Sequence, residues 1–197
     1  MKKAAFEELV LQALETEMGG VQVYENAVSC AVNADLKREW QKYLTQTREH
    51  VRIVEGLCDE LGIDPDTESP GRSVIKHLGE SLVEAMRMAK ATGGPEAAQL
   101  VALECVVIAE TKDHMNWELL TEAGNHMKGK GAQEVLAACK QVEEEEDEHL
   151  YHTAGWTREL WIQFLGLPAV LPPPEETKDV KSAIGAERAR QAREEML

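Results

Sequence analysis

The sequence predicts an all-α protein in which four long helices form an antiparallel bundle. Alanine, leucine, glutamate, lysine and glutamine dominate its 197 residues, and aromatic residues make up only 5%, which favours helices over strands. Apolar residues recur at steps of three and four over long stretches, the period of a helix with one buried face. Short turns separate these stretches, and long helices joined by short turns pack side by side in opposite directions.

The first pair of helices is expected at residues 4–32 and 35–61. Asp35 is expected to cap the second helix, while Gly62 and Pro65 end it. The apolar stripe of the first helix comprises Phe6, Leu9, Val10, Ala13, Glu17, Val21, Tyr24, Val28 and Ala31. The stripe of the second comprises Leu36, Trp40, Tyr43, Thr47, His50, Val54, Leu57 and Leu61.

A shorter helix is expected between the two pairs, at residues 73–92. A loop at 64–72 precedes it, and Gly93-Gly94-Pro95 breaks it. Its length suits a crossover that carries the chain from one helix pair to the next. Its single histidine, His77, is expected at the surface.

The second pair of helices is expected at residues 95–123 and 132–164, joined by a glycine-rich loop. Beyond Gly166 a run of prolines cannot continue a helix, because proline lacks the amide hydrogen and clashes with the preceding turn. We therefore expect a bundle over residues 1–166. A Pro-rich linker and a helical tail follow over residues 167–197.

Charge and composition exclude several classes of function. The 36 acidic side chains outnumber the 21 basic ones, and the formal net charge of −15 argues against a nucleic-acid partner. No apolar run approaches the roughly 20 residues that cross a bilayer, and glutamates follow the N-terminal lysines too early for a signal peptide. We therefore expect no membrane partner. The cysteines are isolated from one another, which is typical of a cytoplasmic protein with reduced thiols. They are Cys30, Cys58, Cys105 and Cys139.

Ionisable residues also lie on the apolar stripes, at least one on each long helix. Burying an unpaired carboxylate is costly or shifts its pKa strongly, so each of these residues needs a partner. A metal ion shared by carboxylates and imidazoles would be such a partner. Hydrogen bonds or buried ion pairs among the residues themselves are the alternative. The residues are Glu17, His50, Glu110 and His149.

Counting from the turns places these residues at similar heights. Glu17 and His50 each lie fifteen residues from the first turn. Glu110 lies fourteen residues from the second turn, and Glu145 and Glu146 lie fourteen and fifteen from it. At 1.5 Å per residue, both pairs place such groups roughly 21–23 Å from their turns. The acidic run around Glu146 exceeds one helical turn, so one or two of its members face inward, and the sequence leaves open whether Glu145 or Glu146 does.

This pattern resembles the ferritin-like superfamily of di-iron and di-manganese carboxylate proteins. In that superfamily two helices each carry one glutamate and two carry Glu-x-x-His. Glu110 followed by Glu146-x-x-His149 matches the second half of the pattern. Aromatic residues also follow Glu17 and Glu110 by seven positions, at Tyr24 and Trp117. The resemblance spans roughly residues 5–165 and implies iron or manganese as the cofactor, held as a dinuclear centre.

The first half departs from the pattern at Thr47, three residues before His50, because threonine cannot supply a bridging carboxylate. His114 and His152 add imidazoles near the same interior, so a histidine-rich, asymmetric site or a single ion is also open. Iron, manganese and zinc all accept mixed nitrogen and oxygen ligands, and a bundle without metal is a further alternative. The expected metal ligands are Glu17, His50, Glu110, His114, Glu146 and His149.

Three functions follow from these expectations. The first is a metal-binding protein that acts as an oxidase, a peroxide-handling enzyme or an iron-handling protein. The second is a metal-free scaffold or binding protein on the same fold. The third is a small-molecule enzyme with a pocket between helices and His114 as an acid or base. The sequence does not decide whether the chain is an enzyme. An apolar-patterned outer helix and tail predict self-association as a homodimer or a larger homo-oligomer.

Overall fold

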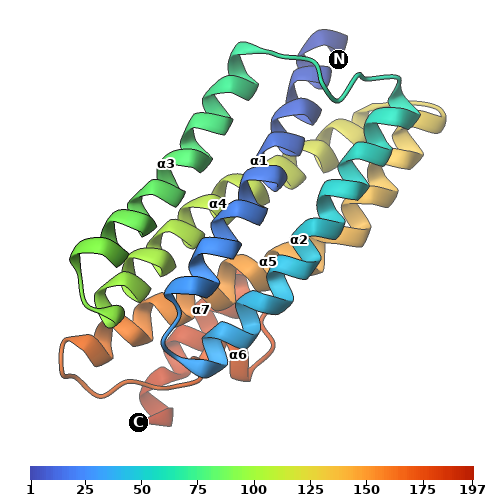
Figure 1. Ribbon diagram of the computed structural model, residues 1–197. Helices are drawn as coiled ribbons and strands as arrows, with labels where there is room; N and C mark the ends of the chain where they lie inside the picture. Colours follow the sequence, from blue (N-terminus) through green and yellow to red (C-terminus); the bar gives the residue numbers. More distant parts are fainter.

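Long packed helices make up most of the chain and form a bundle (Figure 1). The computed structural model describes residues 1–197, apart from the side chain of residue 194, and the described chain contains no strand. The all-α fold predicted from the sequence is therefore confirmed. The long helices are α1 (Lys3–Cys30), α2 (Ala34–Leu61), α3 (Pro70–Thr92), α4 (Pro95–His126) and α5 (Lys130–Phe164). The tail forms α6 (Pro174–Thr177), α7 (Ala183–Gln191) and a 3₁₀ turn (Ala192–Met196).

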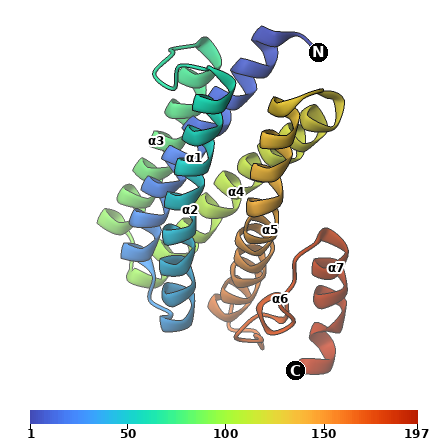
Figure 2. The same cartoon turned by 90° about the vertical axis from the view of Figure 1, so that its right-hand side faces the viewer.

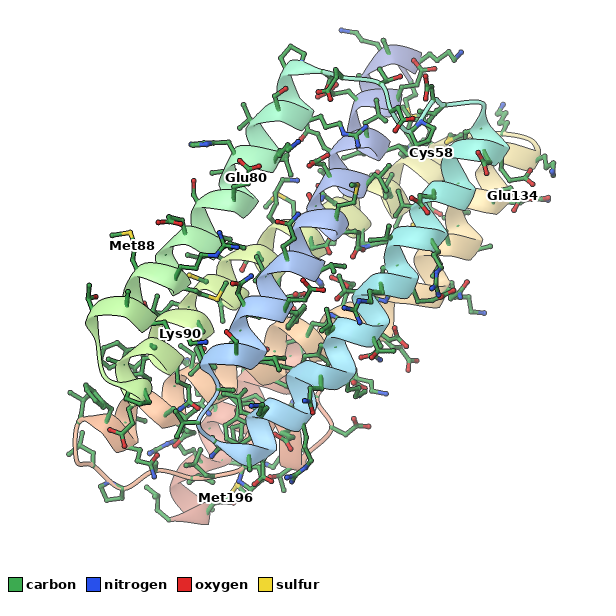
Figure 3. The ribbon with its side chains drawn as sticks, in the orientation of Figure 1. Cys58, Glu80, Met88, Lys90, Glu134 and Met196 are labelled. Carbon is green, nitrogen blue, oxygen red and sulfur yellow. The ribbon has the colours of Figure 1, made fainter. Side chains whose placement is uncertain are left out.

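Four of the long helices surround a common interior. α1 packs against α2 and α4, and α5 packs against α4 and α2. Helices that follow one another directly, α1 with α2 and α4 with α5, run in opposite directions (Figures 1 and 2). α3 lies outside this group, against α1 and α4, and carries the chain from the end of α2 to the start of α4. Glu80 and Met88 project from it into solvent (Figure 3), and His77 is exposed as expected.

Capping residues fix where the helices begin and end. Asn33, not Asp35, caps α2: its side-chain oxygen accepts hydrogen bonds from the amides of Asp35 at 2.9 Å and Leu36 at 3.1 Å. The prediction for Asp35 is wrong because this residue already lies inside the first turn. Gly62 ends α2 in the left-handed conformation at φ 68°, as predicted. Ser69 caps α3, which therefore begins three residues before the expected start.

Two apolar clusters fill the interior, one toward each end of the bundle. One cluster includes Trp40 and Trp156 and extends to Tyr24, whose ring lies 5.8 Å from the His149 ring. The other includes Phe6 and extends to Trp117, whose ring lies 6.4 Å from the His50 ring. A band of buried polar residues therefore separates the two apolar clusters. The four cysteines are free and buried.

The tail packs on α5 and is held there by an ion pair and a backbone hydrogen bond (Figure 2). Arg158 donates two hydrogen bonds to Glu175, at 2.6 and 2.8 Å, and Glu159 accepts from the Val170 amide at 2.8 Å. Burial and the neighbouring carboxylate of Glu39 on α2 raise the pKa of Glu176 to about 8. Glu176 is therefore protonated at neutral pH and stays in contact with the ionised Glu39.

The helices of the described chain do not include one that combines the length and the apolarity needed to cross a membrane.

Candidate metal centre

Five of the six residues predicted as metal ligands meet in the interior of the bundle. They come from four helices, which the two antiparallel pairs bring to one level. The Glu146 Oε1 atom lies 3.0 Å from His50 Nδ1 and 3.5 Å from His149 Nδ1. Glu17 Oε1 is 3.7 Å from His50 Nδ1, and Glu110 Oε2 is 3.6 Å from His149 Nδ1. All five side chains are buried.

Glu146 and His149 share a face of α5 because three residues make nearly one helical turn. Glu146 thus stands at the middle of the cluster and reaches the histidines of two different helices. Glu145, one position earlier, points outward and its side chain is 39% exposed. The structure therefore resolves the choice that the sequence left open: Glu146 faces the interior.

Each histidine is held from its outer side, so that its inner nitrogen faces the cluster. His50 Nε2 lies 2.8 Å from Glu145 Oε2, and His149 Nε2 lies 3.2 Å from Gln46 Oε1. When Nε2 carries the proton and donates to these oxygens, Nδ1 presents a lone pair to the interior. Metal-binding histidines are commonly oriented in this way by a carboxylate or carbonyl oxygen on the far nitrogen.

One buried polar atom on each of six residues lacks a hydrogen-bond partner and faces the cluster. Such atoms are rare and cost about 1–3 kcal/mol each when nothing satisfies them. The set combines four carboxylates with two imidazoles, a donor set that iron, manganese and zinc accept. The atoms are Glu17 Oε2, His50 Nδ1, Glu110 Oε2, Asp113 Oδ1, Glu146 Oε2 and His149 Nδ1.

Asp113 is the member of this set that sequence reasoning missed. It lies three residues after Glu110, so both carboxylates share one face of α4. Asp113, Glu17 and Glu146 each offer an oxygen within 4.8 Å of the others, and His50, Glu146 and His149 form a second group by the same measure. The spacing Glu110-x-x-Asp113 was the signal that could have revealed it.

Thr47 occupies the position on α2 where the resemblance calls for a carboxylate. Its hydroxyl donates to the Tyr43 carbonyl oxygen at 2.9 Å, within its own helix. Its methyl group packs toward Gly20, where an added Cβ would lie 3.2 Å from it. α2 therefore contributes no carboxylate at this level, and α4 contributes two.

His114 lies outside the cluster, although it was predicted with the ligands. It follows Asp113 directly, and one residue turns a helix by about 100°, so the two side chains cannot both face inward. His114 is half-buried, with Nδ1 3.7 Å from Asp147 Oδ1 and Nε2 3.5 Å from Glu118 Oε1. His152 also lies elsewhere, between Glu39 at 3.0 Å and the Val180 carbonyl oxygen at 3.1 Å.

Burial and mutual interaction perturb the pKa values of the cluster strongly. Burial favours the neutral imidazoles, but nearby carboxylates outweigh it. Glu146 and Glu17 raise the pKa of His50 to about 11. Glu110 and Glu146 raise the pKa of His149 to about 9. Burial also raises the pKa of Glu17 to about 7. The pKa of Glu146 falls to about 2, because both imidazoles outweigh its burial. Without a cation, the two histidines therefore hold protons that a bound metal ion would displace.

Aromatic side chains enclose the cluster. The Trp117 indole N–H donates to Glu17 Oε1 at 2.9 Å, and the Tyr43 ring lies 4.2 Å from the His149 ring. Burial and the nearby Glu110 carboxylate raise the pKa of Tyr24 well above its usual range, so its hydroxyl stays protonated. These groups place oxidisable rings beside the carboxylates. Neither protein-family models, nor curated proteins, nor solved structures give a match to this chain.

Proposed function

We propose that this chain is a ferritin-like protein that binds iron or manganese between α1, α2, α4 and α5. In this proposal α3 is the crossover helix, residues 1–166 are the metal-binding unit and residues 167–197 are an accessory tail. The observation that carries the proposal is the convergence of six buried polar atoms that lack partners. Cations bound among these atoms would provide partners that the protein's own hydrogen bonds do not.

The donor set fits two divalent ions. Glu146 belongs to both groups of close donor atoms, one with Glu17 and Asp113 and one with His50 and His149. A carboxylate shared by two groups is what a dinuclear site requires. The four carboxylates of the cluster, when ionised, carry four negative charges, which balance two divalent cations when both histidines are neutral. Asp113 thereby replaces the carboxylate that Thr47 does not provide.

Iron or manganese bound here would supply redox chemistry suited to oxidase, peroxide-handling or iron-handling activity. The chain's own residues have supporting roles. Trp117 fixes the orientation of Glu17 through its indole N–H. Glu145 and Gln46 hold the outer nitrogens of the two histidines. Tyr24 and Tyr43 cover the other side of His149 and keep bulk water away.

A metal-free scaffold is the second candidate function, and two observations favour it. His50 Nδ1 lies only 3.0 Å from Glu146 Oε1, so the charged histidine and carboxylate stabilise each other without a cation. Thr47 also removes one expected carboxylate. In a scaffold, replacing buried charges by apolar groups of similar volume is neutral or stabilising. The two candidates therefore differ in what substitution of the cluster does.

Elemental analysis of purified protein after incubation with Mn(II) or anaerobic Fe(II) tests the proposal. We expect one or two equivalents of bound metal and a marked rise in the melting temperature. The double variant Glu110→Gln/His149→Leu should lose both. Glu80→Gln/His77→Leu is a matched control, because both residues are exposed on α3, away from the cluster. Background levels of metal in the wild-type protein would refute the proposal. A melting temperature of the metal-free double variant equal to or above that of wild type would favour the scaffold.

We further propose that the protein self-associates through α4. Ile108, Met115 and Leu119 lie on this helix at spacings of seven and four residues, and their side chains are exposed. Apolar side chains in such a row favour a helix from a second copy. Sedimentation of the wild-type protein beside Ile108→Glu measures this, and a monomeric wild-type protein would refute it.

A further inference from the structure

A groove in the surface between α4 and α5 leads from solvent to the cluster. Its volume is about 370 Å³, and the start of α7 forms part of its rim through Ser182 and Ala183. Trp117 and Glu146, which are both buried, are among its lining residues. The acidic and histidine residues that line it are His114, Glu118, Glu122, Glu143, Glu146 and Asp147. Lysine and arginine do not occur among the described lining residues.

The acidic side chains of the groove form a series from exposed to buried. Glu122 and Glu118 are 70% and 68% exposed, Asp147 is 15% exposed, and Glu146 is 2% exposed. His114 lies between them, with Nε2 facing Glu118 at 3.5 Å and Nδ1 facing Asp147 at 3.7 Å. The series ends at Glu146, whose buried Oε2 atom has no hydrogen-bond partner.

We propose that this groove is the route by which divalent cations reach the buried cluster, with Glu118, His114 and Asp147 as successive transient ligands. The proposal rests on the proposed metal-binding function. A cleft lined by one sign of charge raises the local concentration of the opposite ion and increases its association rate by about 10–10³-fold. Both nitrogens of His114 face carboxylates at distances too long for strong hydrogen bonds, so they remain free to exchange between partners.

Other approaches to the cluster suit a cation less well. A pocket of about 150 Å³ between α1, α3 and α4 lies behind Thr16 and Gly20, which flank Glu17. Its walls are almost entirely apolar; Lys112 lines it, and the acidic lining residue, Glu15, is paired with Arg72. On the side of α2, Lys42 lies beside Glu148 and neutralises it. The groove between α4 and α5 thus combines negative charge with direct access to a ligand carboxylate.

The rate of Mn(II) uptake tests the proposal. The loss of the free Mn(II) electron paramagnetic resonance signal gives both the rate and the final occupancy. Glu118→Gln/Asp147→Asn should take up Mn(II) at least about 10-fold more slowly than wild type and reach the same final occupancy. Its rate should also depend less on ionic strength. Glu25→Gln/Glu134→Gln is the control, because it removes equal charge at residues that do not line the groove; Figure 3 shows Glu134 near the start of α5.

A second variant tests the uptake route without removing a carboxylate. Ala183→Lys places a positive charge at the rim of the groove and should also slow uptake. Uptake by both groove variants at the control rate would overturn the proposal. A lower final occupancy at an unchanged rate would also overturn it, because Glu118 and Asp147 would then belong to the binding site itself. Wild-type protein that binds no Mn(II) even after refolding in its presence would refute the metal-binding function. Binding only after refolding would leave that function intact and overturn the route.

Discussion

Replacement of Glu146 by glutamine perturbs the centre of the cluster at nearly constant volume. The change removes the charge that lies 3.0 Å from His50 Nδ1 and 3.5 Å from His149 Nδ1. Both imidazoles owe much of their raised pKa to this carboxylate. In metal-free Glu146→Gln, the two histidines therefore either bind protons less strongly or remain charged without the carboxylate that they share. Both outcomes make the folded protein less stable.

The magnitude follows from the pKa of Glu146, which falls from 4.5 to about 2 on folding. One pKa unit corresponds to about 1.4 kcal/mol, so the charge stabilises the folded protein by about 3 kcal/mol at neutral pH. Breaking a buried ion pair by removing one partner costs about 3–5 kcal/mol, which agrees. Because the folded pKa is lowered, this stabilisation is present above pH 4.5 and is lost as the pH falls toward 2.

Urea unfolding of metal-free wild type and Glu146→Gln at pH 7 measures the free energy of unfolding. We expect the variant to be less stable by about 3 kcal/mol, and the difference to shrink between pH 4.5 and pH 2. Glu144→Gln is the control, since that side chain is 77% exposed on the same helix. A difference below about 1 kcal/mol at pH 7, within the range of ordinary surface substitutions, would refute the reasoning. A difference that stays constant down to pH 2 would refute it as well.

Three further predictions concern the supports of the cluster and the tail. Gln46→Leu removes the oxygen that holds the outer nitrogen of His149. Mn(II) affinity should therefore fall about 10–100-fold in a titration, and unchanged affinity would contradict this role. The folded pKa of Glu176 is raised to about 8, so its stabilisation of the docked tail is complete below pH 4.5 and disappears as the pH rises through 8. Proteolysis of the tail should accelerate over that range in wild type but not in Glu176→Gln, and equal slopes would argue against the carboxyl pair. Gly155→Ala should release the tail at every pH, because its Cβ would meet the Glu175 carboxylate at 2.5 Å and Pro173 Cβ at 3.1 Å. A tail that still resists proteolysis in this variant would show that the contact can relax.

The helical bundle was readable from the sequence because its signals are local. Apolar periodicity and turn residues act within a few positions, so they marked five long helices close to their observed bounds. Counting residues from the turns also placed Glu17 level with His50, since the rise per residue is fixed. The errors in the helices themselves were at their ends, where Asn33 instead of Asp35 satisfies the free amides.

Which side chains face inward depended on tertiary packing. Neighbouring residues differ by about 100° around a helix, and the rotation of each helix is set by all the surfaces that it packs against. The packing of α4 therefore turned Asp113 inward and His114 outward, and the packing of α5 chose Glu146 over Glu145. The sequence by itself determined the helices, their pairing and the height of the buried polar band. Only the tertiary structure decided which donors share it, because an α-helix specifies the angles between its own residues but not its rotation against its neighbours.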